Sequence, residues 1–296
     1  MNIGIDLGGS HIAVGLVNEE NKIISKKEHN WTKEEKEDLI KKQEYYCKKL
    51  IKEIIEENKN IKIEKIGIGY PYRNIVNGII YREGKEIKLV DILYKEYRIP
   101  VYLKNDVKCS AICEKTIGNL KEYDNCIFMT LGTGIGGAYF YKNELVTPNK
   151  YQGFEIGHMV IEANGRKCRC GNKGCFEEYA SMRIFRKQIA ELFALEDINS
   201  SKMFEILESK QKREETNKII ENYTTYLSIG ISNLINIFES DAICIGGSFT
   251  YYAPIFMDKL KEKIQNNFKE RTIPDIILAK FENDAGIIGA SMLSSN

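Results

Sequence analysis

The sequence has few features that set it apart from an ordinary globular protein. Its 296 residues include only five prolines, one tryptophan and three histidines. No apolar run approaches the ~20 residues that a membrane span needs, so we expect no membrane contact. The 43 basic and 42 acidic residues leave a formal charge of +1, which provides no basic face for nucleic acid. We expect a soluble, cytoplasmic α/β protein of two lobes, since the chain exceeds the usual size of one domain.

One stretch concentrates rare residue types. It holds one of the three histidines and three of the eight cysteines: His158, Cys168, Cys170 and Cys175. Three thiolates and an imidazole form a complete tetrahedral ligand set for structural zinc, and the short spacings let one loop close around the ion. Disulfides would need an oxidising compartment, and the chain starts without a signal peptide. A redox pair would more usually be spaced Cys-x-x-Cys. We therefore predict a zinc site, bracketed by the carboxylates of Glu155 and Glu177.

The other five cysteines lie in apolar, periodic contexts, and we expect them in the core. They are Cys47, Cys109, Cys113, Cys126 and Cys244.

Three predicted strands end in glycine turns. Gly8-Gly9-Ser10 separates strands at 2–7 and 12–17, and Gly246-Gly247 follows a strand at 242–245. The turn at 132–137 follows a strand at 125–131 and matches the dinucleotide fingerprint G-x-G-x-x-G. That fingerprint requires a helix next, whereas strand fragments follow here, so Rossmann binding is excluded. Backbone N–H groups of such turns can hold phosphate, and Asp6 could hold Mg²⁺ through water. Taken alone, the first turn is more often an ordinary hairpin, and Gly246-Gly247 is better explained as an ordinary strand-to-helix turn.

The pair Asn105-Asp106 follows a predicted strand at 100–103 and opens a helix that runs to about 117. This is the usual ligand position of an open α/β sheet. Simple capping of the helix explains the pair as well, and both interpretations stay open.

Helical periodicity predicts a helix from Thr32, where Thr32 and Glu35 can form a capping box. Further helices are expected at 91–97, 178–195, 203–208, 214–239, 254–268 and 285–293. Further strands are expected at 22–28, 63–69 and 276–279, with a weak extended stretch at 79–81.

In this order the motifs resemble those of the ROK family (repressors, open reading frames and sugar kinases) over nearly the whole chain. Asp-Leu-Gly-Gly-Ser at 6–10 and Leu-Gly-Thr-Gly-Ile-Gly-Gly at 131–137 are similar to its two phosphate motifs, and Asn105-Asp106 to its catalytic pair. Glu-Ile-Gly-His at 155–158 and the segment 168–177 resemble its zinc and sugar signature. Gly246-Gly247 resembles its adenosine-contacting turn, and 284–289 its C-terminal helix.

The resemblance implies a two-lobed, actin-like (RNase H-like) ATPase fold. The smaller lobe would span 1–118, with a helix at about 285–296 packed back on it, and the larger lobe 119–284. It also implies an ATP-dependent hexose kinase of glucokinase type, in which Asp106 is the base that activates a sugar 6-hydroxyl. The implied metals are Mg²⁺ and structural Zn²⁺, and the implied oligomer is a homodimer. The implied sugar-binding residues are Gly69, Asn105, Glu155, His158 and Glu177. The implied ATP-binding residues are Asp6, Gly8, Gly9, Ser10, His11, Gly132, Thr133, Gly134, Gly136, Gly246 and Gly247.

Three positions depart from the family pattern. Tyr72 replaces the second glycine of Gly-x-Pro-Gly, Lys108 replaces the second asparagine of Asn-Asp-x-Asn, and Ser10-His11 stands where Thr-Lys is common. The first two leave open a kinase for N-acetylglucosamine, N-acetylmannosamine, fructose or allose, or for another amino sugar. A repressor is disfavoured because the first strand at residue 2 leaves no room for a helix-turn-helix. A silent sugar-binding module is disfavoured because both phosphate turns and Asp106 are present.

Overall fold

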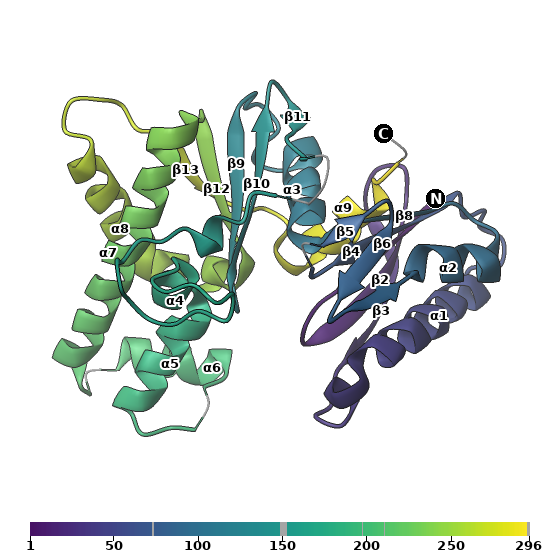
Figure 1. Cartoon of the computed structure of the whole chain (residues 1–296), viewed down its shortest axis with the longest axis horizontal. Helices are drawn as coiled ribbons and strands as arrows, with labels where there is room; N and C mark the ends of the chain where they lie inside the picture. The colour runs from purple at the N-terminus through teal and green to yellow at the C-terminus, as the bar shows by residue number, and fades with distance from the viewer. Residues whose placement is uncertain (73, 149–152, 197, 210, 295–296) are drawn as a thin grey trace. The chain divides into compact units, whose positions relative to one another are not determined.

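The computed structural model describes residues 1–294 except 73, 149–152, 197 and 210. The chain forms two compact units (Figure 1). Unit 1 comprises the described residues of Met1–Glu122, Glu144–Gly153 and Lys280–Asn296, and unit 2 those of Tyr123–Asn143 and Phe154–Ala279.

A five-stranded sheet of order β3-β2-β1-β4-β8 forms the centre of unit 1. β1 is antiparallel to β2 and parallel to β4, which is in turn parallel to β8. The strands are β1 (Asn2–Leu7), β2 (His11–Val17), β3 (Ile23–Asn30), β4 (Lys65–Tyr70) and β8 (Val101–Asn105).

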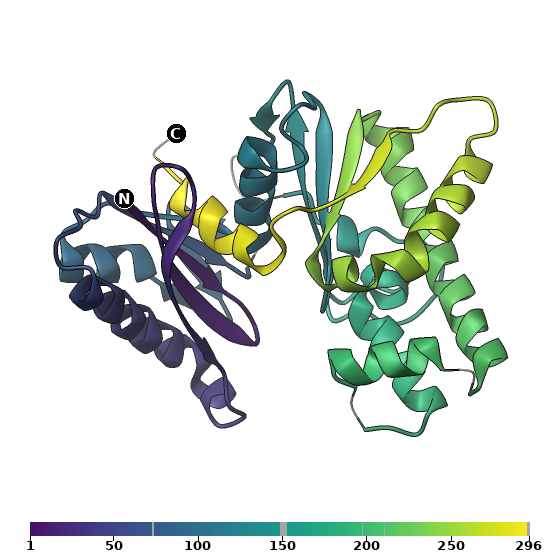
Figure 2. The same ribbon diagram turned by 180° about the vertical axis from the view of Figure 1, so that it is seen from behind.

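The two faces of this sheet differ because side chains alternate along a strand. The odd-numbered residues Ile3, Ile5 and Leu7 are fully buried in one core with α1 (Leu39–Glu57) and α2 (Leu89–Tyr97). The opposite face carries glycines and is covered by α9 (Ala285–Ser291), which lies beside α3 (Asp106–Ile117) (Figure 2). A Cβ on Gly4 would lie 1.9 Å from Ile287 O, and one on Gly67 would lie 1.7 Å from Ala290 O. Only glycine therefore allows α9 to pack this closely.

In unit 1 the predicted start of one helix is wrong, whereas the extended stretch predicted at 79–81 is confirmed. The capping box forms, with Thr32 N donating to Glu35 Oε2 and Glu35 N to Thr32 Oγ1, but it opens a 3₁₀ turn at Glu35–Asp38 and α1 begins only at Leu39. Glu35 also binds His29 and Tyr46, which keeps this segment against β3. The weak stretch at 79–81 is the middle of a small sheet formed by β5 (Ile75–Val76), β6 (Ile79–Arg82) and β7 (Lys85–Ile87).

Unit 2 is built on neighbouring strands in the order β10-β9-β12-β13. They are β9 (Cys126–Leu131), β10 (Ile135–Tyr141), β12 (Ala242–Gly246) and β13 (Asp275–Leu278); β11 (Glu144–Leu145) follows β10 in the chain. The helices are α4 (Glu177–Ala180), α5 (Met182–Leu192), α6 (Ser200–Glu208), α7 (Arg213–Phe238) and α8 (Ala253–Asn267). α7 packs against α8, α5 and α4 over a single core.

The predicted helix at 178–195 is broken at Ser181. The backbone of Ser181 is extended, and the Ser181 hydroxyl caps α5 by accepting a hydrogen bond from Ile184 N at 3.4 Å. All five cysteines expected in the core are buried, as predicted.

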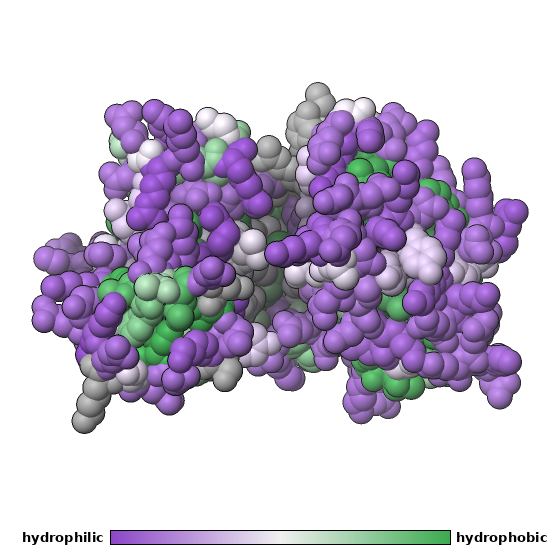
Figure 3. All heavy atoms as spheres, turned by 90° about the horizontal axis from the view of Figure 1, so that it is seen from below, coloured by the Kyte–Doolittle hydropathy of each residue, from purple (hydrophilic) through white to green (hydrophobic). Residues whose placement is uncertain are grey.

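The face in Figure 3 is mostly hydrophilic, with one larger group of apolar side chains at the lower left and smaller groups elsewhere. Within the described part of the chain, no helix has the length and apolarity required to cross a membrane.

Candidate functional site

The first glycine turn connects β1 to β2 in unit 1. Gly8 N donates to His11 O at 2.8 Å, which closes the turn. Ser10 Oγ lies 3.2 Å from His11 Nδ1, so these two side chains sit together on the turn. Burial lowers the pKa of His11; Glu28 partly opposes this effect and Lys26 adds to it, so the imidazole is disfavoured as a cation.

Asp6 lies at the end of β1, on the face that α9 covers. A Cβ on Gly286 would come 2.7 Å from Asp6 Oδ2, so α9 meets this carboxyl group directly. Burial raises the pKa of Asp6 to about 6, and Lys26 only partly opposes the rise. A buried carboxylate with a raised pKa gains from any cation placed beside it. Its chemistry therefore suits the water-mediated magnesium contact predicted for it.

Of the two interpretations of Asn105 and Asp106, the structure shows helix capping by Asn105, and the catalytic role of Asp106 stays a prediction. Asn105 is the N-cap of α3, where its Oδ1 accepts from Lys108 N at 3.3 Å. Its Nδ2 donates to Asp106 Oδ1 at 3.0 Å, and Val107 N donates to the same oxygen at 2.9 Å. The cap residue thus orients the carboxylate of its neighbour, which suits Asp106 for a reaction at a fixed position.

Two further residues of unit 1 lie close to this pair. A Cβ on Gly69 would come 3.3 Å from the Asp106 Cα, so Gly69 packs against the start of α3. Lys108, which departs from the family pattern, is buried, and its Nζ donates to Gly153 O at 3.1 Å.

The second glycine turn, in unit 2, is a tight connection of Gly132, Thr133 and Gly134 between β9 and β10. Gly132 N donates to Gly134 O at 3.0 Å. A strand follows the turn, as predicted when Rossmann binding was excluded. Gly136 lies within β10, opposite Thr130, so it belongs to the strand and not to the turn.

The predicted zinc ligands come together in unit 2. The ligand atoms of His158, Cys168, Cys170 and Cys175 all lie within 4.8 Å of one another. Cys168 Sγ is 3.7 Å from His158 Nδ1, and Cys170 Sγ is 3.6 Å from Cys175 Sγ. Tetrahedral zinc with Zn–S bonds of about 2.3 Å separates its ligand atoms by about 3.7 Å, so the four residues fit this ion.

The protonation of these thiols also bears on a metal. Burial raises the pKa of Cys168 to about 12, whereas the backbone at Asn172 lowers the pKa of Cys170. A bound cation would favour the thiolate form that a ligand requires.

Both carboxylates that bracket the loop lie near His158. Glu155 Oε2 is 4.0 Å from His158 Nε2, on the ring nitrogen that faces away from Cys168. Glu177 is buried, with Oε1 3.8 Å from His158 Nδ1 and 3.5 Å from Arg169 Nε. A Cβ on Gly157 would lie 2.2 Å from Ile135 O, so this loop packs directly on the start of β10.

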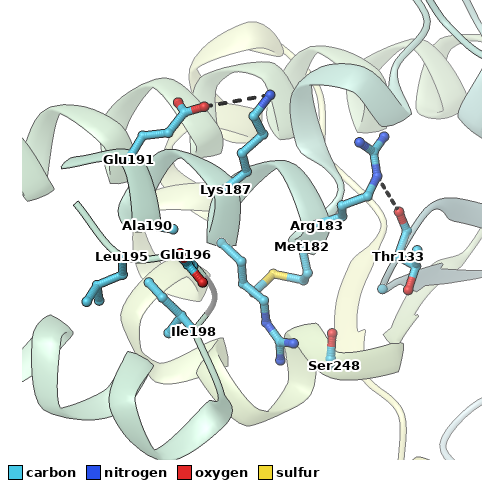
Figure 4. A pocket seen from close by; sticks show the side chains of 12 residues that line it. Thr133, Met182, Arg183, Lys187, Ala190, Glu191, Leu195, Glu196, Ile198 and Ser248 are labelled. Atoms are coloured by element: carbon cyan, nitrogen blue, oxygen red, sulfur yellow. Dashed lines mark hydrogen bonds and ion pairs between the residues drawn. The ribbon is translucent and has the colours of Figure 1, made fainter. Parts of the chain in front are cut away.

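The third turn lies against the second. Gly247 has φ +78°, and a Cβ there would come 2.7 Å from Leu131 O. A pocket of about 470 Å³ adjoins both turns (Figure 4). Residues of the second turn, the start of α5 and the segment after Gly247 line it, among them Gly132, Thr133, Met182, Arg183, Lys187 and Ser248.

Two residues that contact the turns were not predicted. Trp31 Nε1 donates to Gly8 O at 3.1 Å, and Arg183 Nε donates to Thr133 O at 3.1 Å. Neither lies in a motif; the only sequence signal was that Trp31 is the one tryptophan of the chain.

Comparison with known proteins gives these features a context. A sequence profile of the ROK family matches residues 2–296. The chain is 29% identical to a glucokinase from Thermotoga maritima, over 98% of this chain and 96% of that protein. It is also 29% identical to a xylose repressor from Caldicellulosiruptor bescii, over 88% of this chain and 69% of the repressor.

Among solved structures, a ROK family glucokinase from Streptomyces griseus in complex with glucose and AMPPNP is similar. The TM-score is 0.82 at 23% identity, over 98% of this chain and 97% of the other. The expected two-lobed, actin-like ATPase fold is confirmed.

Proposed function

The chain belongs to the ROK family, and from this premise we propose that it is an ATP-dependent sugar kinase. It transfers the γ-phosphate of ATP to the 6-hydroxyl of a hexose, in the manner of a glucokinase. The observation that carries this proposal is the carboxylate of Asp106, held at the start of α3 by Asn105 Nδ2 and by Val107 N.

Asp106 acts as the general base. One of its oxygens takes the proton of the sugar 6-hydroxyl while the hydroxyl oxygen bonds to the γ-phosphorus and ADP leaves. Position counts most in phosphoryl transfer, since little covalent chemistry falls to the protein. The two hydrogen bonds to Oδ1 fix the rotamer of Asp106 for this task, and Asn105 also binds the sugar.

The donor is bound by the glycine turns. The phosphates are bound by backbone N–H groups of the first turn, Gly8-Gly9-Ser10 with His11. They are also bound by those of the second turn, Gly132-Thr133-Gly134, and of Gly136. Gly246-Gly247 lies along the adenosine. Asp6 contacts Mg²⁺ through water, which neutralises charge on the phosphoryl oxygens when the ion is bound.

The metal loop orients the sugar. His158, Cys168, Cys170 and Cys175 would hold Zn²⁺, and the bound ion would supply a rigid centre for the loop. Metal binding at Nδ1 leaves the proton of His158 on Nε2, where it can donate to a sugar hydroxyl. Glu155 and Glu177 bind further hydroxyls, and Gly69 lets the sugar approach the backbone.

The sugar itself is proposed as glucose. Tyr72 and Lys108 motivate the alternative of a kinase for N-acetylglucosamine, N-acetylmannosamine, fructose or allose. The relation to a xylose repressor motivates a second alternative, a sugar-binding regulator without catalysis. A homodimer in the cytoplasm stays a prediction.

The experiment is an ADP-release assay with a panel of hexoses and N-acetylhexosamines. We expect Asp106→Asn to lower kcat by about a thousandfold, within the range for loss of a general base. The exposed Asp91→Asn on α2 is the matched control and should leave kcat unchanged. Unchanged turnover in Asp106→Asn would refute the assignment of the base. Sugar binding without ADP release from the wild-type protein would favour the regulator.

A further inference from the structure

We infer that Trp31 and Arg183 are positioning residues that hold the two phosphate-binding turns from their carbonyl sides. Each residue donates two hydrogen bonds to one turn, one from its backbone N–H and one from its side chain. This inference rests on the proposed function, because it assumes that the turns bind the phosphates of ATP.

Trp31 holds the first turn. Its backbone N donates to Ser10 O at 2.9 Å, and its indole Nε1 donates to Gly8 O at 3.1 Å. The side chain is itself fixed, being 6% exposed and packed edge-on against His29 and Tyr46. The indole therefore reaches the turn from a rigid aromatic support.

Arg183 holds the second turn in the same way. Its backbone N donates to Gly132 O at 3.2 Å, and its guanidinium Nε donates to Thr133 O at 3.1 Å. The backbone contact uses an N–H of the first turn of α5, which has no partner within the helix. The start of α5 is thereby attached to the turn through one residue.

The carbonyl contacts matter because the peptide unit is planar and trans. The carbonyl of one residue and the N–H of the next point in opposite directions. Donors on Gly8 O therefore fix the direction of the Gly9 N–H, and donors on Gly132 O and Thr133 O fix those of Thr133 and Gly134. A rotated peptide plane would turn a carbonyl oxygen toward a phosphate, which repels it.

The guanidinium of Arg183 is oriented in turn. Its NH2 group donates to Glu178 Oε1 at 2.9 Å, and that carboxylate is largely buried. Figure 4 shows Arg183 reaching the Thr133 carbonyl, whereas Lys187, one turn further along α5, extends to Glu191. Arg183 thus acts by geometry, which a lysine at the same position could not reproduce.

The test measures KM for ATP and for the sugar in parallel. Trp31→Phe keeps the aromatic packing and removes the donor to Gly8 O, and we expect KM for ATP to rise about fivefold, as for one neutral hydrogen bond. Arg183→Met removes a charged donor, and we expect a rise of about tenfold or more. Arg183→Lys should behave nearly as Arg183→Met. The KM for the sugar and the bound metal should stay close to wild type.

Two matched variants separate position from packing and charge. Tyr46→Phe removes a hydroxyl from the same aromatic cluster without contact to the turn. Lys218→Met removes an exposed cation from α7 of the same unit, where its Nζ pairs with Glu214. Both should change KM for ATP by less than about twofold. In a Glu178→Gln background, Arg183→Met should lose part of its effect, because the two residues act together.

The outcomes are distinguishable. Wild-type protein that neither binds nor hydrolyses ATP with any sugar of the panel would refute the proposed function and this inference with it. An active wild type with unchanged KM for ATP in both Trp31→Phe and Arg183→Met would overturn the inference alone. Equal losses in ATP affinity, sugar affinity and Tm would show a merely structural role and would also overturn it.

Discussion

Replacement of Asp6 by asparagine should stabilise unit 1 while it abolishes the kinase reaction. Asp6 is largely but not fully buried at the end of β1, against Gly286 of α9, and this burial raises its pKa from 3.8 to about 6. The folded chain must therefore carry a carboxylate that it disfavours at neutral pH. Asparagine has nearly the same shape and no charge to desolvate.

The size of the effect follows from the pKa shift. A rise from 3.8 to about 6 is about two units, and at about 1.4 kcal/mol per unit the ionised group costs about 3 kcal/mol. Between these pH values the folded state binds the proton that the unfolded state has released, so stability falls as pH rises. The cost is absent below pH 3.8 and is fully present above about pH 6. Asp6→Asn should thus gain stability over wild type progressively across this range.

Urea unfolding at several pH values, with Mg²⁺ chelated, measures this difference. The fluorescence of Trp31 reports the unfolding of unit 1, because Trp31 is the only tryptophan and lies in that unit. Asp258→Asn, an exposed change on α8, serves as the control and should show no gain with pH. In the presence of Mg²⁺ and ATP, wild type should be stabilised and Asp6→Asn should not.

A variant that is no more stable than wild type at pH 7.5, or whose advantage does not grow between pH 4 and 6.5, would refute this reasoning. Hydrogen bonding to the carboxylate would then outweigh its desolvation. Retention of full kinase activity in Asp6→Asn would refute the proposed magnesium contact instead.

Two further predictions concern the metal loop and the glycine face. Cys170→Ser should lose the metal, as measured by elemental analysis of the purified protein. It should also raise KM for the sugar about tenfold or more, with a much smaller effect on KM for ATP. A wild-type protein without zinc would contradict the account of the loop. Gly67→Ala would place a Cβ 1.7 Å from Ala290 O. Because the backbone of β4 and of α9 would have to move, we expect a loss of at least about 3 kcal/mol in unfolding free energy. An unchanged Tm would show that α9 is not packed on β4 as described.

Local rules predicted most of the elements because each depends on neighbouring residues. The alternation of Ile3, Ile5 and Leu7 defines β1, and the apolar spacing in 214–239 predicts α7 to within one residue at each end. The zinc ligands were found because three of them lie within eight residues of one another. The fourth, His158, was found because histidine is rare in this chain.

Contacts between distant residues explain what the sequence did not reveal. Glu35 forms its capping box, but the same carboxylate also contacts His29 and Tyr46, and α1 begins only at Leu39. Trp31 and Gly8 are 23 residues apart, and Arg183 and Thr133 are 50 apart, so no local pattern marks these pairs. The separation of capping by Asn105 from orientation of Asp106 needed side-chain positions, since both residue types cap helices well.

The placement of α9 has a consequence for the order in which the protein is made. β1 and β4 leave the ribosome early, but their glycine face at Gly4 and Gly67 packs against Ala285–Ser291, which follows all of unit 2 in the chain. Unit 2 is therefore complete before unit 1, which reverses the usual order of folding from the N-terminus. Until α9 arrives, the backbone of Gly4 and Gly67 lies open to other chains. Limited proteolysis of chains that end at Ala279 should find unit 2 protected and β1 still cleaved.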